Sequence, residues 1–362
     1  MDKERISPGQ FFSLIFLFEI GTAVVLPIGF AARQTVWLSI LLALIGGILL
    51  FLVYDYLYRQ YPELPLSEYA QRILGKYMGW TLSLTYIPVF IYIAARDLRE
   101  AGDLLVTASY DQTPILAIMA LMILTVVYVL HKGVEVLARM AEIYLIMLIG
   151  IGVLGNIFIL LSGIFEVKNL LPVLGDGWKP ILEAAYPEIY IFPFGEMICF
   201  TMILPFLNQP HRGRKTGIKA LMASGIILSF THAMEIAVLG EDMYNRSAFP
   251  LFVAISEVNI MDFLQRLDAI VIITLIIGVF FKLSIYCYAA LIVASSLFNV
   301  DKQKLLWPIA ICVLISSLMI SSNLAEHFAE GKPILHIILP IFSTGIPLLL
   351  LMVHLIRKRF GL

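Results

Sequence analysis

Long apolar runs separated by short polar segments make up most of the chain. Residues 143–165, 305–325 and 333–356 contain no Asp, Glu, Lys or Arg. Each run is long enough to cross a bilayer as an α-helix, which takes roughly 20 apolar residues. A large soluble core would require polar faces on its outer helices, and these runs have none. The pattern therefore predicts an all-α polytopic membrane protein.

The spacing of the apolar runs predicts ten transmembrane helices. Their expected bounds are 10–31, 35–54, 80–108, 112–130, 139–162, 181–207, 216–239, 266–298, 305–325 and 333–356. The third and eighth runs are long, so these spans should tilt or extend beyond the bilayer. A short interfacial helix is expected within "YRQYPELPLSEYAQRILGKYMG". Another is expected around residues 248–255, in the loop 241–265.

Composition supports a membrane protein. The chain of 362 residues is 60% hydrophobic and 14% charged, whereas soluble domains carry about 25% charged residues. The sequence has no basic run suited to nucleic acid, so no nucleic-acid partner is expected. The N-terminal "MDKERISPGQ" runs directly into the first span without a small-residue cleavage site. We therefore expect no removable signal peptide.

The sequence contains no recognisable enzyme motif. It has no P-loop, nucleophile elbow or zinc signature, so we expect no catalysis, cofactor or metal. Cys199, Cys287 and Cys312 lie in apolar runs, without the spacing of a disulfide framework or a metal site. Each cysteine is expected to be a small core residue.

Basic residues are distributed unevenly over the connecting segments. With this set of spans, sixteen Lys and Arg fall on the side of the N-terminus and five on the opposite side. Cytoplasmic segments carry the excess of Lys and Arg in membrane proteins. Both termini are therefore expected in the cytoplasm.

Ten spans divide into two halves of five, and an odd number gives the halves opposite topology. We expect a single transmembrane domain over residues 1–362, with inverted repeats at about 10–162 and 181–356. Spans one and six are equivalent in such an arrangement. Interrupted helices at these two positions mark a substrate site near the membrane midplane.

Both equivalent spans contain residues that break helices. "FEIGTAVVLPIGF" in span one holds Gly21, Pro27 and Gly29, and "YIFPFGEMI" in span six holds Pro193 and Gly195. An unwound helix exposes N–H groups that can hold a carboxylate and C=O groups that can hold an ammonium group. A zwitterionic amino acid would suit both. The alternative is that Gly and Pro are simply frequent in membrane helices.

Lys282 lies near the middle of span eight, in "IIGVFFKLSIYCYAALI". A lysine at this depth must pair, deprotonate or face a cavity. It could replace a coupling cation, bind a ligand carboxylate, or form a structural ion pair with Glu196, Glu19 or Glu142. Glu196 in turn could bind a ligand ammonium group, pair with Lys282 or cap a half-helix.

Two other groups of ionisable residues are expected to be mainly structural. His232, near Glu235 in span seven, fits a satisfied interior histidine better than a proton relay, although a relay stays open. In "ARDLREAGD" of span three, the i, i+4 pairs Arg96–Glu100 and Arg99–Asp103, with Asp97 among them, favour a structural or gating network.

Several apolar and aromatic residues could shape the walls of a pocket. The candidates in span three are Tyr86, Val89 and Ile93. Spans six and eight contribute Phe192, Phe194, Tyr286 and Tyr288, which either line a pocket or belong to a lipid-facing aromatic belt.

An ordered set of segments resembles the B subunits of bacterial spore germinant receptors (the GerAB/GerBB type), within the amino acid–polyamine–organocation transporter superfamily. The segments are "ISPGQFF", "LVYDYLYRQYP", "KGVEVLARMAEIY", "NLLPVLGDGWKPIL", "FPFGE", "MILPFLN", "RLDA" at 266–269 and "GVFFKLSIYCYAA". Each is weak alone, but together they span nearly the whole chain in order.

The resemblance implies a LeuT-like fold with a 5+5 inverted repeat and broken helices 1 and 6. It also implies a germinant-binding subunit in the spore inner membrane, with a larger membrane-spanning A subunit and a lipoprotein C subunit as partners. The superfamily's ligand contacts correspond by position to Gly21, Thr22, Ala23, Phe194 and Gly195. Lys282 lies near the superfamily's sodium region, which makes sodium coupling doubtful.

Three functions follow as hypotheses. The first is a subunit that senses an amino acid or similar nutrient through a transporter-like pocket, with Val89, Ile93, Glu196, Lys282 and Tyr286 also contacting the ligand. The second is an active amino-acid permease, possibly proton-coupled. The third is a structural scaffold with an empty pocket.

Overall fold

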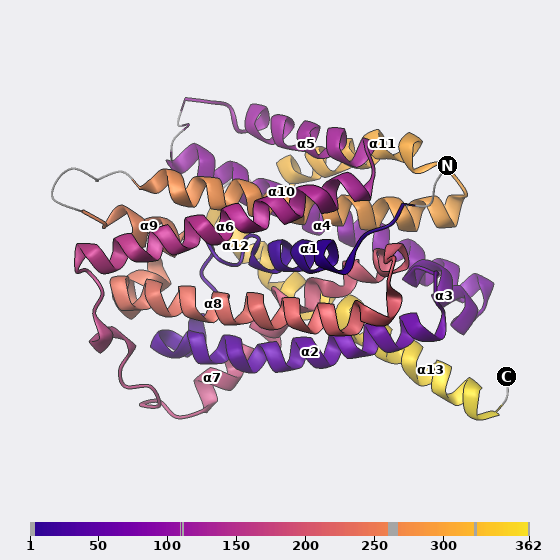
Figure 1. Cartoon of the computed structure of the whole chain (residues 1–362), viewed down its shortest axis with the longest axis horizontal. Coiled ribbons are helices and arrows are strands. Elements are labelled where there is room, and N and C mark those ends of the chain that lie inside the picture. The colour runs from indigo at the N-terminus through magenta and orange to yellow at the C-terminus, as the bar shows by residue number, and fades with distance from the viewer. Residues whose placement is uncertain (1–3, 109, 111, 260–266, 322–323, 361–362) are drawn as a thin grey trace.

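The computed structural model describes residues 4–108, 110, 112–259, 267–321 and 324–360, and within them it is a bundle of helices (Figure 1). The α-helices are α1 (Pro8–Ile20), α2 (Val36–Gln60), α3 (Leu66–Leu74), α4 (Lys76–Ala108), α5 (Ile115–His131), α6 (Val134–Ser162), α7 (Lys179–Glu183), α8 (Pro210–Arg246), α9 (Pro250–Ser256), α10 (Asp268–Phe298), α11 (Lys302–Met319), α12 (Leu324–Pro333) and α13 (Ile346–Phe360). Short 3₁₀ segments are η1 (Phe30–Thr35), η2 (Val167–Leu170), η4 (Phe194–Met202) and η5 (Leu204–Phe206), and π-turns are η3 (Ala184–Ile189), η6 (Ile334–Ile338) and η7 (Ile341–Gly345). Of the described residues, only Ile6 and Leu207 pair in a β-bridge, and it is isolated.

In the described part of the chain, seven helices are long and apolar enough to cross a membrane. Two further apolar helices, α1 and α5, are shorter, and the predicted sixth span falls on the broken stretch from α7 to η5. The protein is therefore a multi-pass membrane protein, while the count of ten spans and the repeat boundaries stay predictions. The short helices expected in two connections are present as α3 and α9. Residues 260–266, in the second of these connections and at the predicted start of span eight, lie outside the described residues.

Helix α10 is the most buried of the seven, with 72% of its apolar window inside the bundle. It packs against α4, α1, α6 and α11. A helix that is apolar on all sides is expected in such a central position. Helix α6 has only 17% of its window buried, so most of its apolar surface is left to face lipid. Both chain ends lie at one end of the bundle, here called the termini end, and the opposite end is the far end (Figure 1).

The two predicted helix breaks are present. Ser7 and Gln10 form a capping box at the start of α1, and the helix ends at Ile20 because Gly21 turns to φ +26°. The chain then continues without regular α-helix, through Gly29 at φ +65°, until α2 begins. Glycine tolerates positive φ where other residues are strained. In the sixth segment, the helical geometry changes from π-turns to 3₁₀ around Pro193, which cannot donate a backbone hydrogen bond.

One cysteine does not follow the prediction. Cys199 and Cys287 are buried, as expected, but Cys312 is exposed. Cys312 lies on the outer face of α11, a helix with 28% of its apolar window buried, so its apolar surroundings in sequence reflect contact with lipid and not a core. Residues that face lipid are as apolar as those inside, and sequence therefore does not separate the two.

Candidate functional site

A cavity of about 840 Å³ lies between the two broken segments and opens in the far half of the bundle. Its walls come from α4, from the segment after the break in α1, from η3 and η4, and from α12 and η6. The charged side chains that line it are Arg96, Asp97, Glu100, Glu188, Glu196, Arg246 and Lys332. A cavity of this size, with convergent charged groups, is large enough for a small-molecule ligand.

Lys282 of α10 lies beneath this cavity, where three elements bring acceptors to its ammonium group. Nζ lies 2.6 Å from Glu196 Oε2 and 3.6 Å from Asp97 Oδ1. It also lies 3.3 Å from Thr22 Oγ1, on the unwound segment. The lysine side chain is fully buried, and burial without partners would be very costly for a charged group. The two carboxylates therefore compensate the charge, and their side chains form the floor of the cavity, here called the charged floor (Lys282, Glu196 and Asp97).

Gly21 makes room for the lysine stem. A Cβ atom at this position would lie 2.6 Å from Lys282 Cδ and 2.6 Å from the carbonyl oxygen of Phe18. Thr22 follows at once, and its hydroxyl also bonds Asp97 Oδ1 at 3.3 Å. The break in α1 therefore does two things: it passes close to the lysine stem and it places one hydroxyl on the charged floor.

Of the three carboxylates expected as partners of Lys282, Glu196 forms the ion pair. Glu142 is exposed and lies 3.5 Å from Gln10 Nε2 instead, so that alternative is wrong. Glu19 is fully buried, interacts electrostatically with Glu196 and Lys282, and both its carboxylate oxygens lack a hydrogen-bond partner among the described residues.

Asp97 was not expected as a partner of Lys282. The sequence places Asp97 in a charged cluster toward the end of span three, where the residues around it form two i, i+4 pairs that do not include it. A signal was present: Asp97 is the one charged residue between Arg96 and Arg99, and neither predicted pair uses it. Those two pairs do form, Arg96–Glu100 at 3.7 Å and Arg99–Asp103 at 3.0 Å.

The Arg96–Glu100 pair continues to α12. Arg96 Nη1 donates to the backbone carbonyl of His327 at 3.2 Å, and His327 Nε2 lies 3.0 Å from Glu100 Oε1. The network therefore joins α4 to α12 across one wall of the cavity, and its structural or gating role stays a prediction.

The unwound segment after the break in α1 is held by α8. His232 Nε2 donates to the carbonyl oxygen of Ala23 at 3.0 Å, and the Tyr244 hydroxyl lies 2.9 Å from His232 Nδ1 and 3.3 Å from Ile28 N. Gly29 N donates to Glu188 Oε1 at 3.0 Å. Side chains of the protein therefore already bind the N–H groups of Ile28 and Gly29, which lie in the broken segment where we expected N–H groups free to hold a ligand carboxylate.

The predicted wall residues divide between the cavity and the surrounding core. Ile93 and Phe192 line the cavity. The centroid of the Phe192 ring lies 4.5 Å from Lys282 Nζ. Tyr286 is buried beside Glu196. Gly195 approaches Ser343 and Tyr190 closely.

The remaining predicted residues contact other parts of the bundle. Phe194 packs against Gly47 of α2, and Tyr86 donates to the carbonyl of Phe342 at 2.9 Å. Val89 is half-buried outside the cavity lining. Tyr288 is outside the lining of this cavity and does not face lipid, because it is buried and its hydroxyl donates to Glu4 Oε2 at 2.9 Å. Ligand contact by any predicted site residue stays a prediction.

The site offers charge of both signs but no metal cluster. No group of three or more His, Cys, Asp and Glu side chains that could hold a metal ion occurs in the described part of the chain. Asp97 Oδ2 has no hydrogen-bond partner among the described residues, while Asp97 and Arg96 both line the cavity. An acceptor and a donor one residue apart are suited to a small molecule that carries both an ammonium and a carboxylate group.

Comparison with protein families gives a match over most of the chain. The model of the family described as "Spore germination protein" matches residues 5–325. Spore germination protein KB of Bacillus subtilis (strain 168) is 38% identical over 362 residues, which cover 99% of this chain and 97% of that protein. Spore germination protein YndE of the same organism is 27% identical over 329 residues, covering 89% and 88% of the two chains.

Comparison with solved structures shows the fold. Mhp1, a nucleobase-cation-symport-1 family transporter in a closed conformation with bromovinylhydantoin bound, superimposes with a TM-score of 0.68 over 94% of this chain and 78% of its own. MhsT in complex with L-phenylalanine gives a TM-score of 0.63 over 94% and 90%. Both are 12% identical to this chain. Because both have the LeuT fold, the predicted fold class is confirmed.

Proposed function

The chain belongs to the spore germination protein family, and we propose that it is the nutrient-sensing membrane subunit of a spore germination receptor. The nutrient is an amino acid or a similar small molecule that binds in the cavity above the charged floor. The observation that carries this proposal is the buried Lys282 ammonium group paired with Glu196 and Asp97 beneath a cavity of about 840 Å³.

The ligand's ammonium group contacts Glu196 and the unpartnered Oδ2 of Asp97. Two N–H groups after the break in α1 are already bound by Tyr244 and Glu188, so we assign the ligand's carboxylate to Arg96, which lines the same cavity. Guanidinium groups bind carboxylates with bidentate geometry.

A ligand ammonium group competes with Lys282 for the same two carboxylates. Binding therefore changes the charge balance under the broken segments and favours a different arrangement of the bundle, because a ligand shifts an equilibrium by its difference in affinity for the two states. Larger A and lipoprotein C subunits would convert this shift into germination. Our proposal places the chain in the spore inner membrane with both termini in the cytoplasm, so the cavity opens outward.

An active amino-acid permease, possibly proton-coupled, is the second candidate. The two solved structures that superimpose over 94% of this chain include one with L-phenylalanine bound. A sensor that descends from a transporter would keep the same pocket, so the difference between the two functions lies in whether the transport cycle is completed.

Uptake of labelled amino acids by proteoliposomes that contain this chain alone, with and without a proton gradient, separates the candidates. A receptor should bind ligand in these vesicles without saturable uptake, whereas a permease should take it up. Gly195→Leu should abolish the binding while the protein still inserts, because even a Cβ atom would lie 3.3 Å from Ser343 Oγ and from the Tyr190 carbonyl. Normal binding by this variant would contradict the site. A scaffold would bind no ligand at all.

A further inference from the structure

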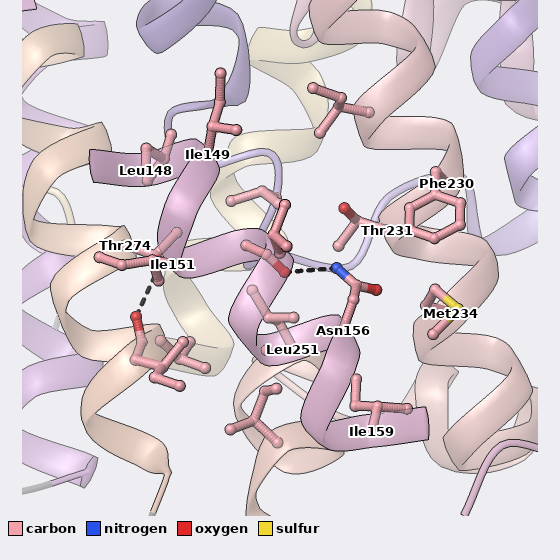
Figure 2. Close-up of a pocket in the computed structure, with 18 of the residues that line it drawn as sticks. Leu148, Ile149, Ile151, Asn156, Ile159, Phe230, Thr231, Met234, Leu251 and Thr274 are labelled. Atoms are coloured by element: carbon pink, nitrogen blue, oxygen red, sulfur yellow. Dashed lines mark hydrogen bonds between the residues drawn. The ribbon is translucent and has the colours of Figure 1, made fainter. Parts of the chain in front are cut away.

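A second cavity, of about 390 Å³, lies between α6, α8, α9 and α10, with α1 contributing to its inner wall. Figure 2 shows its apolar lining, which includes Leu148 and Ile151 of α6, Met234 of α8 and Leu251 of α9. It is separate from the cavity of about 840 Å³ above the charged floor, here called the charged cavity, since no residue lines both.

The mouth of this cavity faces the bilayer. Ile149, Val153 and Leu160 of α6 line it and are 45%, 53% and 58% exposed. They belong to the least buried of the membrane-crossing helices, so their exposed surface meets lipid and not water. A ligand would therefore reach the cavity by first partitioning into the membrane.

One buried acceptor in this apolar wall lacks a donor. Glu235 lines the cavity and is 1% exposed. Its Oε2 lies 2.9 Å from His232 Nδ1, but neither carboxylate oxygen has a hydrogen-bond partner among the described residues. Leaving a buried acceptor unsatisfied costs free energy that a bound donor would recover.

Two other polar side chains of the cavity already have partners. Asn156 Nδ2 donates to the Gly152 carbonyl at 2.8 Å, and Thr274 Oγ1 donates to the Ile270 carbonyl at 2.8 Å (dashed lines in Figure 2). Among the described residues that line this cavity, Glu235 is the side chain with buried acceptor atoms that a ligand's polar end would satisfy.

We propose that this cavity is a bilayer-accessible binding site for an aliphatic molecule that ends in one hydrogen-bond donor, such as a medium-chain primary alcohol, with its hydroxyl donating to Glu235. The chain fits the apolar walls, and the volume is more than twice the roughly 150 Å³ that an apolar cavity needs to hold benzene. A lipid acyl chain alone would fill the walls and leave Glu235 without a donor.

A molecule bound in this cavity is connected to Lys282 and its partners through a chain of contacts. Glu235 touches His232, whose Nε2 holds the Ala23 carbonyl of the unwound segment. A molecule bound at Glu235 therefore acts on the same broken helix that lies next to Lys282, but from the bilayer side.

The test uses proteoliposomes of the full chain and a decan-1-ol probe with a photoreactive diazirine in its chain. We expect saturable labelling of α6 and α8 peptides, mapped by mass spectrometry. Unlabelled decan-1-ol should compete about fivefold better than 1-methoxynonane, an ether with the same number of heavy atoms and no donor, because one net hydrogen bond changes an equilibrium constant by about this factor. Equal competition by the ether would overturn the proposal and indicate a surface for acyl chains only.

Two glycine substitutions on α6 supply matched variants. Gly155 lies at the cavity, where a Cβ atom would meet Ile255 and Ile270 at 3.5 and 3.9 Å, so Gly155→Leu should fill the space. Gly150 has no heavy atom within 4 Å of such a Cβ and faces outward, so Gly150→Leu is the control. We expect labelling to fall at least fivefold in Gly155→Leu and to stay unchanged in Gly150→Leu. Equal labelling in all three proteins would also overturn the proposal. The comparison of alcohol with ether stands on the unmodified chain if a variant fails to fold.

Discussion

At the scale of single residues, Lys282 is the residue that connects the elements of the site. Its ammonium group is fully buried and lies between Glu196 of the sixth segment, Asp97 of α4 and Thr22 of the unwound segment. No other described lysine is completely buried. A buried ammonium group is stable only while its carboxylate partners stay charged and close. A ligand that binds one of these carboxylates should therefore cause the lysine side chain to move.

Removal of the lysine charge should destabilise the protein strongly. Lys282→Met leaves Glu196 and Asp97 facing each other without a cation, and breaking a buried pair in this way costs about 3–5 kcal/mol. We expect a large fall in the unfolding temperature of the purified protein in detergent. The triple variant Lys282→Met, Glu196→Gln, Asp97→Asn should recover much of this loss because no unpaired charge remains. Equal unfolding temperatures for the wild type and Lys282→Met would show that the buried pair contributes nothing.

At the scale of elements, the unwound segment after α1 is held by side chains of its neighbours as well as by its own backbone hydrogen bonds. Tyr244 of α8 is the clearest case, because its hydroxyl contacts both the N–H and the carbonyl of Ile28 and also His232 Nδ1. The unwound segment could therefore move as one unit when these contacts change.

Tyr244→Phe should loosen this segment without disturbing the bundle. The substitution removes one hydroxyl, with an expected cost of about 1 kcal/mol for each net hydrogen bond lost. We predict that amide hydrogens of residues 21–35 exchange about tenfold faster, while those of α10 are unchanged. Tyr77→Phe is the control, since Tyr77 is 86% exposed and away from the segment. Unchanged exchange at residues 21–35 would contradict the holding role of Tyr244.

The elements could largely be predicted from sequence, because hydrophobic length and Gly or Pro breaks are local signals. Helices α3, α4, α9 and α10 lie close to their expected bounds. The partners of Lys282 were harder to predict, since pairing depends on which helices meet. Glu196 was among the expected partners because it follows a break, whereas Asp97 was missed because its neighbours in sequence offered nearer charges.

Side-chain direction was the main source of error. Cys312 and Tyr288 both occur in apolar runs, yet one faces outward and the other binds Glu4 at the termini end. Phe194 follows Pro193 directly and packs against Gly47 of α2. The periodicity of an apolar run does not show which side faces lipid when both sides are apolar, and an irregular backbone removes the periodicity altogether.

At the scale of the whole molecule, the charged cavity opens in the half of the bundle opposite the termini. The excess of Lys and Arg in the connections at the termini end predicts that this end lies in the cytoplasm. The cavity should then be accessible to nutrients from outside the membrane.

Cysteines introduced one at a time into a chain that lacks Cys312 test this orientation. Lys168 in η2 has a side chain that is 77% exposed at the far end, and Arg212 is exposed at the start of α8 near the termini end. In intact cells, a membrane-impermeant maleimide should label Lys168→Cys, and it should label Arg212→Cys only after permeabilisation. The two buried cysteines should stay unreactive. The reverse pattern of labelling would place the cavity toward the cytoplasm.

The most direct test of the central claim is equilibrium binding of a panel of labelled amino acids to the purified full-length protein, to Ile93→Trp and to Ile91→Trp. Ile93 lines the charged cavity, whereas Ile91, two residues earlier on α4, does not. We predict that at least one amino acid binds the wild type and Ile91→Trp with similar affinity, and that Ile93→Trp weakens this binding at least tenfold by filling the cavity. Equal binding by Ile93→Trp, or no binding of any amino acid to the wild type, would contradict a nutrient site above Lys282, Glu196 and Asp97.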